Sequence, residues 1–366
     1  MSGTWGEYVK LSLFGESHGK CVGIVINGLP AGIKLDLDFI RSELARRAPG
    51  KNALSTPRQE KDEFEIISGY FNEHTTGSPL TFIIWNKDSH SNDYEDLKYN
   101  LRPGHADYTA MIKHGGFNDY RGGGHFSGRL TASMVLAGAI AKQILSKKEI
   151  AIGGHVLSIG NIREESFDEL DLAVNSIQEL ARMDFPVLNS AIGEEMQQQI
   201  LLAKAEEDSL GGIVETAAIG LPVGVGSPFF DSLESKIAHL LFSIPAVKGV
   251  EFGAGFAITQ MKGSQANDSF VYVNSRVETL TNHNGGILGG ISNGMPLLFR
   301  TALKPTPSIA KAQSTVDISR NEEVEIRVKG RHDPCIVPRA VPVVESAAAL
   351  AILDLMIEKD GVTWMI

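Results

Sequence analysis

The sequence has few cysteines and no long apolar run, and these two absences exclude whole classes of protein. Cys21 and Cys335 are the only cysteines among 366 residues, so there is neither a CxxC pair nor the disulfide framework of a small secreted domain. No stretch approaches about 18 uninterrupted apolar residues, and the first residues lack the basic and apolar regions of a signal peptide. We therefore expect an unprocessed cytoplasmic protein that does not bind a membrane.

Positive charge is also scarce over the whole chain. Lys and Arg number 34 against 44 Asp and Glu, a formal net charge of -10, which argues against nucleic-acid binding. Arginines nevertheless gather in glycine- and proline-rich stretches, as at Arg47, Arg102, Arg129 and Arg331. An acidic chain with a locally basic site is suited to a small anionic ligand.

The most informative stretch is residues 101–145. Its first half carries Arg102, His105 and Arg129 around the three glycines of residues 122–124, whose uncovered N–H groups can approach an anion. From residue 128 onward the pattern predicts a helix that is apolar nearly all round and hence buried. The N-terminus of such a helix favours an anion at the glycine loop. On glycine content alone, a turn that caps a core helix explains the same residues.

The remaining patterns predict an α+β protein. Strands are expected at residues 8–14, 22–26, 65–67 and 80–85, and helices at 39–47, 232–242 and 345–357. The turn at residues 28–32 is echoed at 220–224, and residues 77–82 are echoed at 294–299. We therefore predict one domain over residues 1–366, built from half-repeats at about 1–147 and 210–366 with a helical insertion at about 148–209. Its fold is a β-α-β sandwich with mostly antiparallel sheets around a central helical layer.

The second half adds three segments with site chemistry. Residues 282–290 form another glycine loop, and Lys304 stands beside the hydroxyls of Thr306 and Ser308 after a strand, which suits a phosphate. Arg331 and Asp333 precede the last core helix. Each segment could be a surface turn, but turn chemistry does not require these charged residues together.

Three other interpretations of these residues are open. Residues 15–19 match the G-x-S-x-G nucleophile elbow of a serine hydrolase, but here the motif leads into a strand rather than a helix. A metal site of His18, His105, His125 and Asp333 lacks close ligand spacing and has cationic neighbours. A non-catalytic phosphometabolite-binding protein would not need histidines beside the arginines, whereas imidazoles suit proton transfer.

Taken in order, the motifs at residues 15–19, 46–50, 102–107, 120–124, 285–290, 304–306 and 331–335 resemble the chorismate synthase family over essentially the whole chain. The resemblance implies an anti 1,4-elimination of phosphate and a ring hydrogen from 5-enolpyruvylshikimate 3-phosphate, the last shared step of aromatic biosynthesis. It implies reduced FMN as cofactor, no net redox change, a homotetramer and a β-α-β sandwich.

Residue roles follow from the resemblance. His18 corresponds to the acid that protonates the departing phosphate, His105 to the histidine beside the flavin, and Asp333 to the carboxylate that helps take up the ring hydrogen. The alternative for Asp333 is that it caps the last helix or pairs with Arg331. The residues implied to bind substrate are Ser17, Arg47, Arg102, Ser127, Arg129 and Arg331. Those implied to bind FMN are Arg47, His125, Phe126, Ser127, Pro245, Ala246, Gly289, Lys304, Pro305, Thr306, Pro307, Ser308 and Arg331.

Three positions depart from the family pattern. Ala53 and His125 stand where arginine is common, and Pro245 stands where asparagine often contacts the flavin. Lys51 or Arg58 could take the place of the missing arginine at Ala53. Some relatives reduce their own FMN with NADPH, and others depend on an external flavin reductase; the motifs do not separate the two types.

Overall fold

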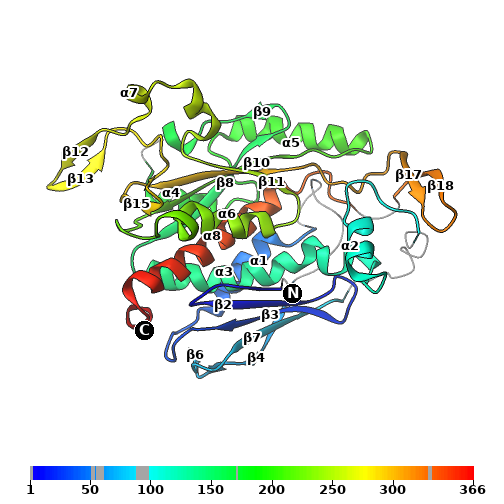
Figure 1. Ribbon diagram of the computed structural model, residues 1–366, viewed down its shortest axis with the longest axis horizontal. Coiled ribbons are helices and arrows are strands. Elements are labelled where there is room, and N and C mark those ends of the chain that lie inside the picture. Colours follow the sequence, from blue (N-terminus) through cyan, green and yellow to red (C-terminus); the bar gives the residue numbers. More distant parts are fainter. Residues whose placement is uncertain (1–2, 51–53, 55–61, 88–98, 170–171, 329–331) are drawn as a thin grey trace.

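The computed structural model describes residues 3–50, 54, 62–87, 99–169, 172–328 and 332–366. Two five-stranded sheets enclose a layer of helices (Figure 1). The first sheet has the order β1-β2-β3-β7-β4, with bounds Thr4–Trp5, Lys10–Gly15, Cys21–Asn27, Leu80–Trp85 and Phe64–Ser68. The second has the order β11-β16-β10-β8-β9, with bounds Val247–Phe252, Leu297–Leu303, Gly212–Ile219, Ala151–Ile159 and Ile162–Arg163. All neighbours in both sheets pair antiparallel, so the predicted α+β sandwich is confirmed.

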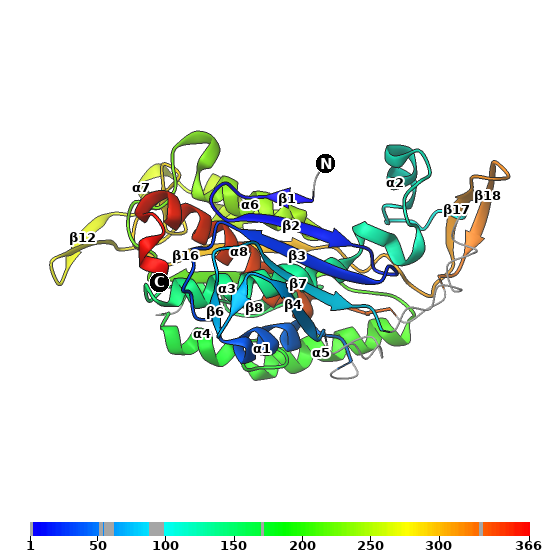
Figure 2. The same cartoon turned by 90° about the horizontal axis from the view of Figure 1, so that it is seen from below.

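The helices of the middle layer are α1 (Leu37–Arg47), α3 (Thr131–Ser146), α6 (Leu233–Ser243) and α8 (Val337–Asp360). Seen from below, the first sheet lies across α3 and α8 (Figure 2). In α3 and α8 nearly every side chain is buried, as the all-round apolar pattern predicts. The two helices approach closely at Gly138, where an added Cβ would lie 2.1 Å from Cβ of Ser346. By length and composition α8 could cross a membrane, but it is buried inside the protein and is a core helix.

A buried ion cluster joins the middle layer to the second sheet. Glu345 of α8 accepts hydrogen bonds from Arg46 (2.6 and 2.8 Å), Lys142 (2.5 Å) and the amide of Gly154 (2.9 Å). Burial opposes the charged form of Glu345, but Arg46 and Lys142 outweigh it and lower its pKa to about 2. Glu345 therefore links α8 to α1, α3 and β8, and Arg46 is its partner from α1.

The prediction for residues 148–209 needs a correction. They are not a helical insertion, because β8 is an interior strand of the second sheet and is buried along almost its whole length. Helices α4 (Val174–Leu180) and α5 (Ser190–Ala205) do follow, and they pack against β8. The segment thus completes the second sheet and covers it.

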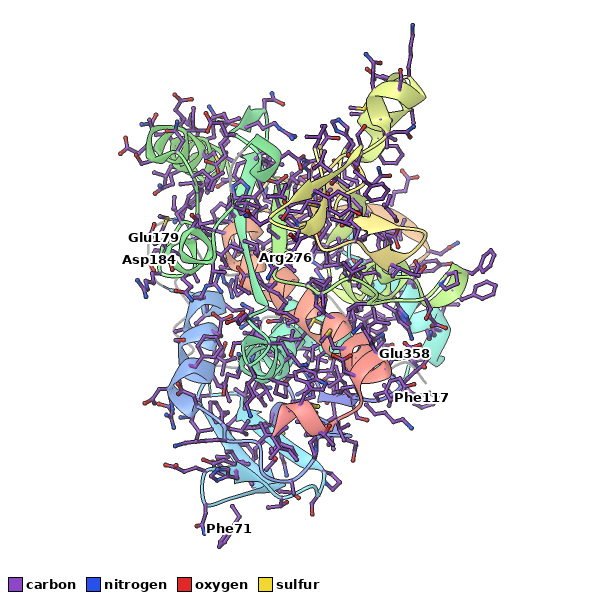
Figure 3. All side chains as sticks on the ribbon, turned by 90° about the vertical axis from the view of Figure 1, so that its left-hand side faces the viewer. Phe71, Phe117, Glu179, Asp184, Arg276 and Glu358 are labelled. Carbon is purple, nitrogen blue, oxygen red and sulfur yellow. The ribbon has the colours of Figure 1, made fainter. Side chains whose placement is uncertain are left out.

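Smaller elements project from the two layers. The hairpin of β12 (Phe270–Val273) and β13 (Arg276–Thr279) extends away from the sandwich (Figure 1), and its Arg276 faces the viewer when the molecule is seen from that end (Figure 3). At the opposite end, α2 (Asp107–His114) lies near the hairpin of β17 (Gln313–Asp317) and β18 (Glu322–Ile326). The other short elements are β5 (Tyr70–Phe71), β6 (His74–Thr75), α7 (Gly263–Ala266), β14 (Ile287–Leu288) and β15 (Ile291–Ser292).

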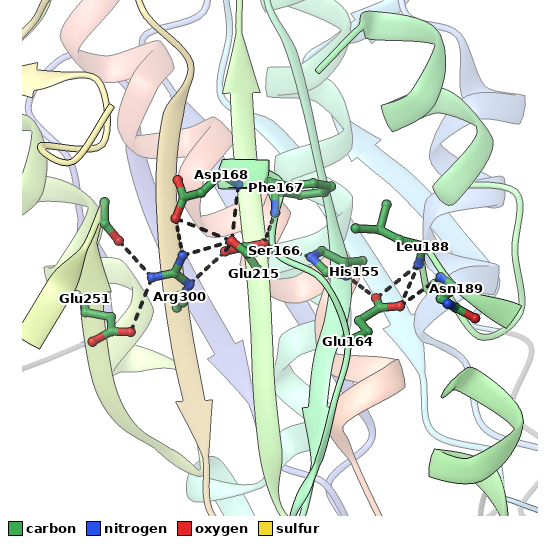
Figure 4. Close-up of polar contacts among 11 residues, drawn as sticks. His155, Glu164, Ser166, Phe167, Asp168, Leu188, Asn189, Glu215, Glu251 and Arg300 are labelled. Atoms are coloured by element: carbon green, nitrogen blue, oxygen red, sulfur yellow. Dashed lines mark hydrogen bonds and ion pairs between the residues drawn. The ribbon is translucent and has the colours of Figure 1, made fainter. Parts of the chain in front are cut away.

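A second buried ion cluster lies within the second sheet (Figure 4). His155 of β8 contacts Glu164 and Glu215, and Glu215 also accepts a hydrogen bond from Arg300 at 2.7 Å. Burial favours the neutral ring of His155, but the hydrogen bonds to Glu164 and Glu215 outweigh it and raise the pKa above 6.5. The cluster therefore stabilises the sheet most when His155 is charged.

We expect the variant His155→Gln to lose about 3–5 kcal/mol of unfolding free energy, because it leaves the buried carboxylate of Glu164 without a cation and that of Glu215 with Arg300 alone. A raised folded-state pKa means that this stabilisation is complete below pH 6.5 and is lost as the pH rises through the folded pKa. Chemical denaturation from pH 6 to 9 measures both effects. His239→Gln, a change at an exposed histidine of α6, is the matched control. A stability gap that widens with rising pH would contradict the assignment.

Candidate active site

Seven of the predicted site residues line one pocket of about 240 Å³. It lies where β2, α1, α6 and β16 end and where α3 and α8 begin. The seven residues are Ser17, His18, Arg47, Ser127, Arg129, Pro245 and Asp333. Two helix N-termini, with their positive dipole ends, therefore lie at a pocket that also contains arginines, an arrangement that favours an anion.

His18 is held in the turn after β2 and is 7% exposed. Its Nδ1 lies 3.0 Å from Oγ of Ser17, and that hydroxyl lies 3.1 Å from the carbonyl of Gly122, to which it donates. If the hydroxyl accepts Nδ1–H, Nε2 is the ring nitrogen left for contact with a ligand. Gly122 has φ +58, and an added Cβ would lie 2.2 Å from the imidazole ring. The glycine loop thus packs directly on His18.

Two arginines of the pocket share one buried carboxylate. Arg47 Nη1 lies 2.9 Å from Asp62, and Arg129 Nη1 binds the other oxygen of the same carboxylate. Arg47 also donates to the hydroxyl of Thr131 at 3.2 Å and to the carbonyl of Gly128 at 2.9 Å. These bonds tie α1 to the start of α3 and fix both guanidinium planes.

The charges of this group shift one another's pKa. Burial is the largest influence on Arg47 and, together with the charges of Arg339 and Arg129, lowers its pKa to about 10 despite the opposing effect of Asp62. Burial would raise the pKa of Asp62, but Arg47 and Arg129 outweigh it and hold that pKa below 3.8. Asp62 is therefore ionised, and one carboxylate neutralises only part of the positive charge of two arginines.

Asp333 lies in the loop before α8 and forms an ion pair with Arg339 in the first turn of that helix. The alternative that Asp333 caps the helix is wrong, because the N-cap is Ile336 and no side chain makes a cap hydrogen bond there. Its other alternative partner, Arg331, lies outside the described residues.

Burial raises the pKa of the neighbouring Cys335 thiol to about 12, so this cysteine is not a nucleophile.

A second group of predicted residues lies beside the pocket. His105 Nδ1 lies 3.1 Å from the carbonyl of Pro103, an acceptor only, so Nδ1 carries the proton and Nε2 accepts from Ser308 at 2.7 Å. Burial and the charges of Arg102 and Lys304 lower the pKa of His105 to about 4, so its ring is neutral near pH 7.

Both groups share the end of β16. Leu303 lines the pocket, and the next residue, Lys304, donates its backbone N–H to Ala246 at 3.0 Å and its Nζ to the carbonyl of Gly104 at 2.6 Å. Arg102 is held by Asp107 at 2.7 and 2.8 Å. The second group is thus joined to the end of β16 next to the pocket, although His105, Arg102, Lys304 and Ser308 do not line it.

Comparisons with known proteins show the family to which this fold belongs. A family model described as chorismate synthase matches residues 9–357. The chain belongs to the chorismate synthase family. The chorismate synthase of Dehalococcoides mccartyi is 47% identical over 355 residues, which cover 97% of this chain and 96% of that protein. The one from Korarchaeum cryptofilum is 49% identical over 354 residues, which cover 96% of each. A crystal structure of a chorismate synthase superposes with a TM-score of 0.76 at 30% identity and covers 98% of this chain and 94% of that one.

Family membership and the structure bear on the three other interpretations. Ser17 follows β2 and leads into the antiparallel β3, so the strand-to-helix context of a hydrolase elbow is missing. Among the described residues, no group of three or more His, Cys, Asp or Glu side chains could hold a metal ion. The relatives are named as synthases, so a non-catalytic binding protein finds no support.

Some predicted residues do not reach the pocket. Gly289 lies in the turn between β14 and β15, next to the start of α6, whereas Pro245 follows the end of that helix about 16 Å away. His125 and Phe126 are exposed near the pocket, with His125 Nδ1 2.9 Å from the carbonyl of Gly15. Pro305, Thr306 and Pro307 belong to the segment after β16. Lys51, Ala53, Arg58 and Arg331 lie outside the described residues.

Sequence reasoning missed Asp62 and Arg339. Asp62 belongs to no motif, and only the need of two buried arginines for a counter-ion could have indicated such a residue. Arg339 had a signal, since it puts a cation into the first turn of a helix, where the dipole favours anions.

Proposed function

We propose that this chain is a chorismate synthase, a lyase that forms chorismate from 5-enolpyruvylshikimate 3-phosphate. The observation that carries the proposal is that His18, Arg47, Arg129 and Asp333 line one pocket. In the reaction the C–O bond to phosphate and a ring C–H bond break, and a new double bond forms in the ring. The pocket therefore needs an anion clamp, an acid at the leaving phosphate and an acceptor for the ring hydrogen.

The chain supplies one group for each task. Arg47 and Arg129 bind the carboxylate or phosphate groups through planar, bidentate donors, and Asp62 keeps both in place. His18 delivers a proton from Nε2 to the departing phosphate, while Ser17 holds the opposite ring nitrogen. Asp333 assists removal of the ring hydrogen. Ser127 begins the turn Gly128–Leu130 and accepts the N–H of Arg129 at 3.2 Å, which orients that arginine's backbone.

The second group of residues fits FMN. Lys304, Ser308, Thr306 and Arg102 offer cations and hydroxyls for a phosphate. Neutral His105 can accept a hydrogen bond from a flavin ring at Nε2 if that bond replaces the one from Ser308. Oγ1 of Thr306 is buried and has no hydrogen-bond partner among the described residues, as expected of an atom that a ligand completes. When bound, reduced FMN supplies electrons to the reacting ring and takes them back, with no net redox change.

Chorismate formation under anaerobic conditions tests the proposal. With reduced FMN we expect chorismate and inorganic phosphate in equal amounts, and no product with oxidised FMN alone. Product with oxidised FMN plus NADPH would identify an enzyme that reduces its own flavin, whereas its absence would indicate an external flavin reductase as partner. No chorismate under any of these conditions would overturn the proposal.

Flavin binding has a separate test. At a hundredfold excess of FMN over Kd we expect stabilisation of about 2.7 kcal/mol, seen as a rise in Tm. Lys304→Gln should reduce this shift, because it removes a cation from the segment proposed to bind phosphate. Lys311→Gln is the matched control, since Lys311 follows in the same segment but pairs with Asp208 at the surface. An equal rise in Tm for the wild type, Lys304→Gln and Lys311→Gln would show that Lys304 does not contribute to flavin binding.

The homotetramer is also a proposal for this chain. Along the β12–β13 arm, the exposed fractions are 65% for Phe270 and 83% for Tyr272, and that of Leu280, just beyond it, is 71%. An isolated two-stranded hairpin with apolar side chains is marginally stable in water, so cover by another copy of the chain explains the arm. Light scattering in solution measures the mass; a monomer would contradict the proposal.

A further inference from the structure

Arg339 occupies a position where local electrostatics disfavour a cation. It is the third residue of α8, in the turn where unpaired N–H groups and the positive dipole end favour a carboxylate. A cation at this unfavourable position needs compensating contacts with other parts of the fold. For Arg339 those contacts lie at the wall of the pocket, which it lines.

One guanidinium joins two walls of the site. Arg339 Nη1 pairs with the carboxylate of Asp333, and its Nε donates to the main-chain carbonyl of Arg47 at 2.9 Å. Arg47 is the last residue of α1, so this carbonyl lacks a partner within its own helix. The side chains of Asp333 and Arg339 are 12% and 20% exposed, which leaves little water to loosen the pair.

The positive charge of Arg47 and Arg129 suggests why Asp333 is held by Arg339. Arg47 and Arg129 share the single carboxylate of Asp62. The charge of Arg339 lies close enough to lower the pKa of Arg47. A second carboxylate that could move in this pocket would be drawn to the same two arginines. Such a carboxylate would compete with an anionic substrate for Arg47 and Arg129, and it would no longer lie at its position in the pocket wall.

We propose that Arg339 is a positioning residue for Asp333. It holds the carboxylate in the wall of the pocket, fixes it to the end of α1, and keeps it from pairing with Arg47 and Arg129. This inference rests on the proposed function, since it presumes that Asp333 assists the removal of the ring hydrogen.

The test combines two substitutions in a double-mutant cycle. Arg339→Met is expected to lower kcat by about 10²-fold, because a small displacement of a reacting group is enough for such a loss. It is also expected to weaken substrate binding in the flavin-free protein, measured by calorimetry, because the released Asp333 competes for the arginines. Arg339→Lys keeps the charge but cannot make both contacts at once, so it should recover part of kcat. Arg41→Met, at an exposed arginine of α1, is the control and should leave all values unchanged.

The decisive measurement is Arg339→Met in a chain that already carries Asp333→Asn. If Arg339 acts through Asp333, the second substitution lowers kcat by less than about threefold, since residues that act as a unit are not additive. Losses that multiply in full would overturn the inference, as would an unchanged kcat in Arg339→Met. If Arg339→Met does not fold, the same cycle with Arg339→Lys decides by the same criterion. Full turnover in Asp333→Asn alone would instead overturn the proposed role of Asp333.

Discussion

Replacing His18 with alanine is expected to lower kcat by about 10² to 10⁴, the usual loss when a general acid is removed. The leaving phosphate would then depart without a proton from Nε2. Substrate binding should largely persist, because Arg47 and Arg129 are held by Asp62 and not by the imidazole. Steady-state kinetics with reduced FMN, with kcat and KM determined separately, measures this.

Ser17→Ala is the matched control for that variant. It removes the hydroxyl that orients the His18 ring but leaves the imidazole in place, so its loss in kcat should be much smaller than that of His18→Ala. A hydrolase with Ser17 as nucleophile would instead lose essentially all activity. A hundredfold rise in KM at constant kcat in His18→Ala would make His18 a binding group and contradict its role as acid.

Asp62→Asn is expected to lower the free energy of unfolding by about 3–5 kcal/mol, because two buried guanidinium groups lose their shared counter-ion. A depressed folded-state pKa means that the stabilisation from Asp62 is present above its ordinary pKa of 3.8 and is lost as the pH falls through the lower, folded value. The stability gap between wild type and variant should therefore narrow in acid. Thermal unfolding from pH 3 to 8 measures it.

An anion should partly replace the missing carboxylate. We expect inorganic phosphate to raise the Tm of Asp62→Asn more than that of the wild type, because the neutral amide of the variant does not offset the positive charge of Arg47 and Arg129. Asp38→Asn is the control, since Asp38 pairs with Arg41 at the surface of the same region. Equal phosphate effects in all three proteins would show that Arg47 and Arg129 do not form an anion site.

Residues of the candidate site that belong to sequence motifs could be predicted. Residues whose position depends on tertiary contacts were harder to predict. The turns that carry His18, Arg129 and Asp333 are distinctive in sequence, and the structure brings all three to one pocket. Arg46 and Arg47 are adjacent in sequence but have different surroundings: Arg46 pairs with Glu345 in the core, and Arg47 lines the pocket. Helix geometry separates neighbouring side chains by about 100°, but the pattern alone does not say which partner each will meet.

The fold shows the same limit at β8. Its sequence places Gly153, Gly154 and His155 in the middle of a strand, and glycine and a polar side chain both weaken the usual strand pattern. The structure explains all three. An added Cβ would lie 2.3 Å from Ile177 at Gly153 and 2.8 Å from a carbonyl of the neighbouring strand at Gly154, and His155 needs Glu164 and Glu215, which lie on other segments. Such contacts are tertiary and leave no local signature.

The position of α8 along the chain bears on how the protein is made. Every strand of both sheets precedes Val337, yet α8 packs against α1, α3, α6, β8 and β10. Its Asp354 also accepts hydrogen bonds from the amides of Tyr8 and Val9 at 2.8 Å, across some 345 residues. At about 5–20 residues per second, a ribosome would need roughly 20 to 70 seconds to reach this helix. Until then the face of the second sheet that α8 covers stays open, whereas the first sheet can already pack on α3. We therefore expect the native state to form only after α8 has emerged, and the nascent chain to need protection of this apolar surface by chaperones.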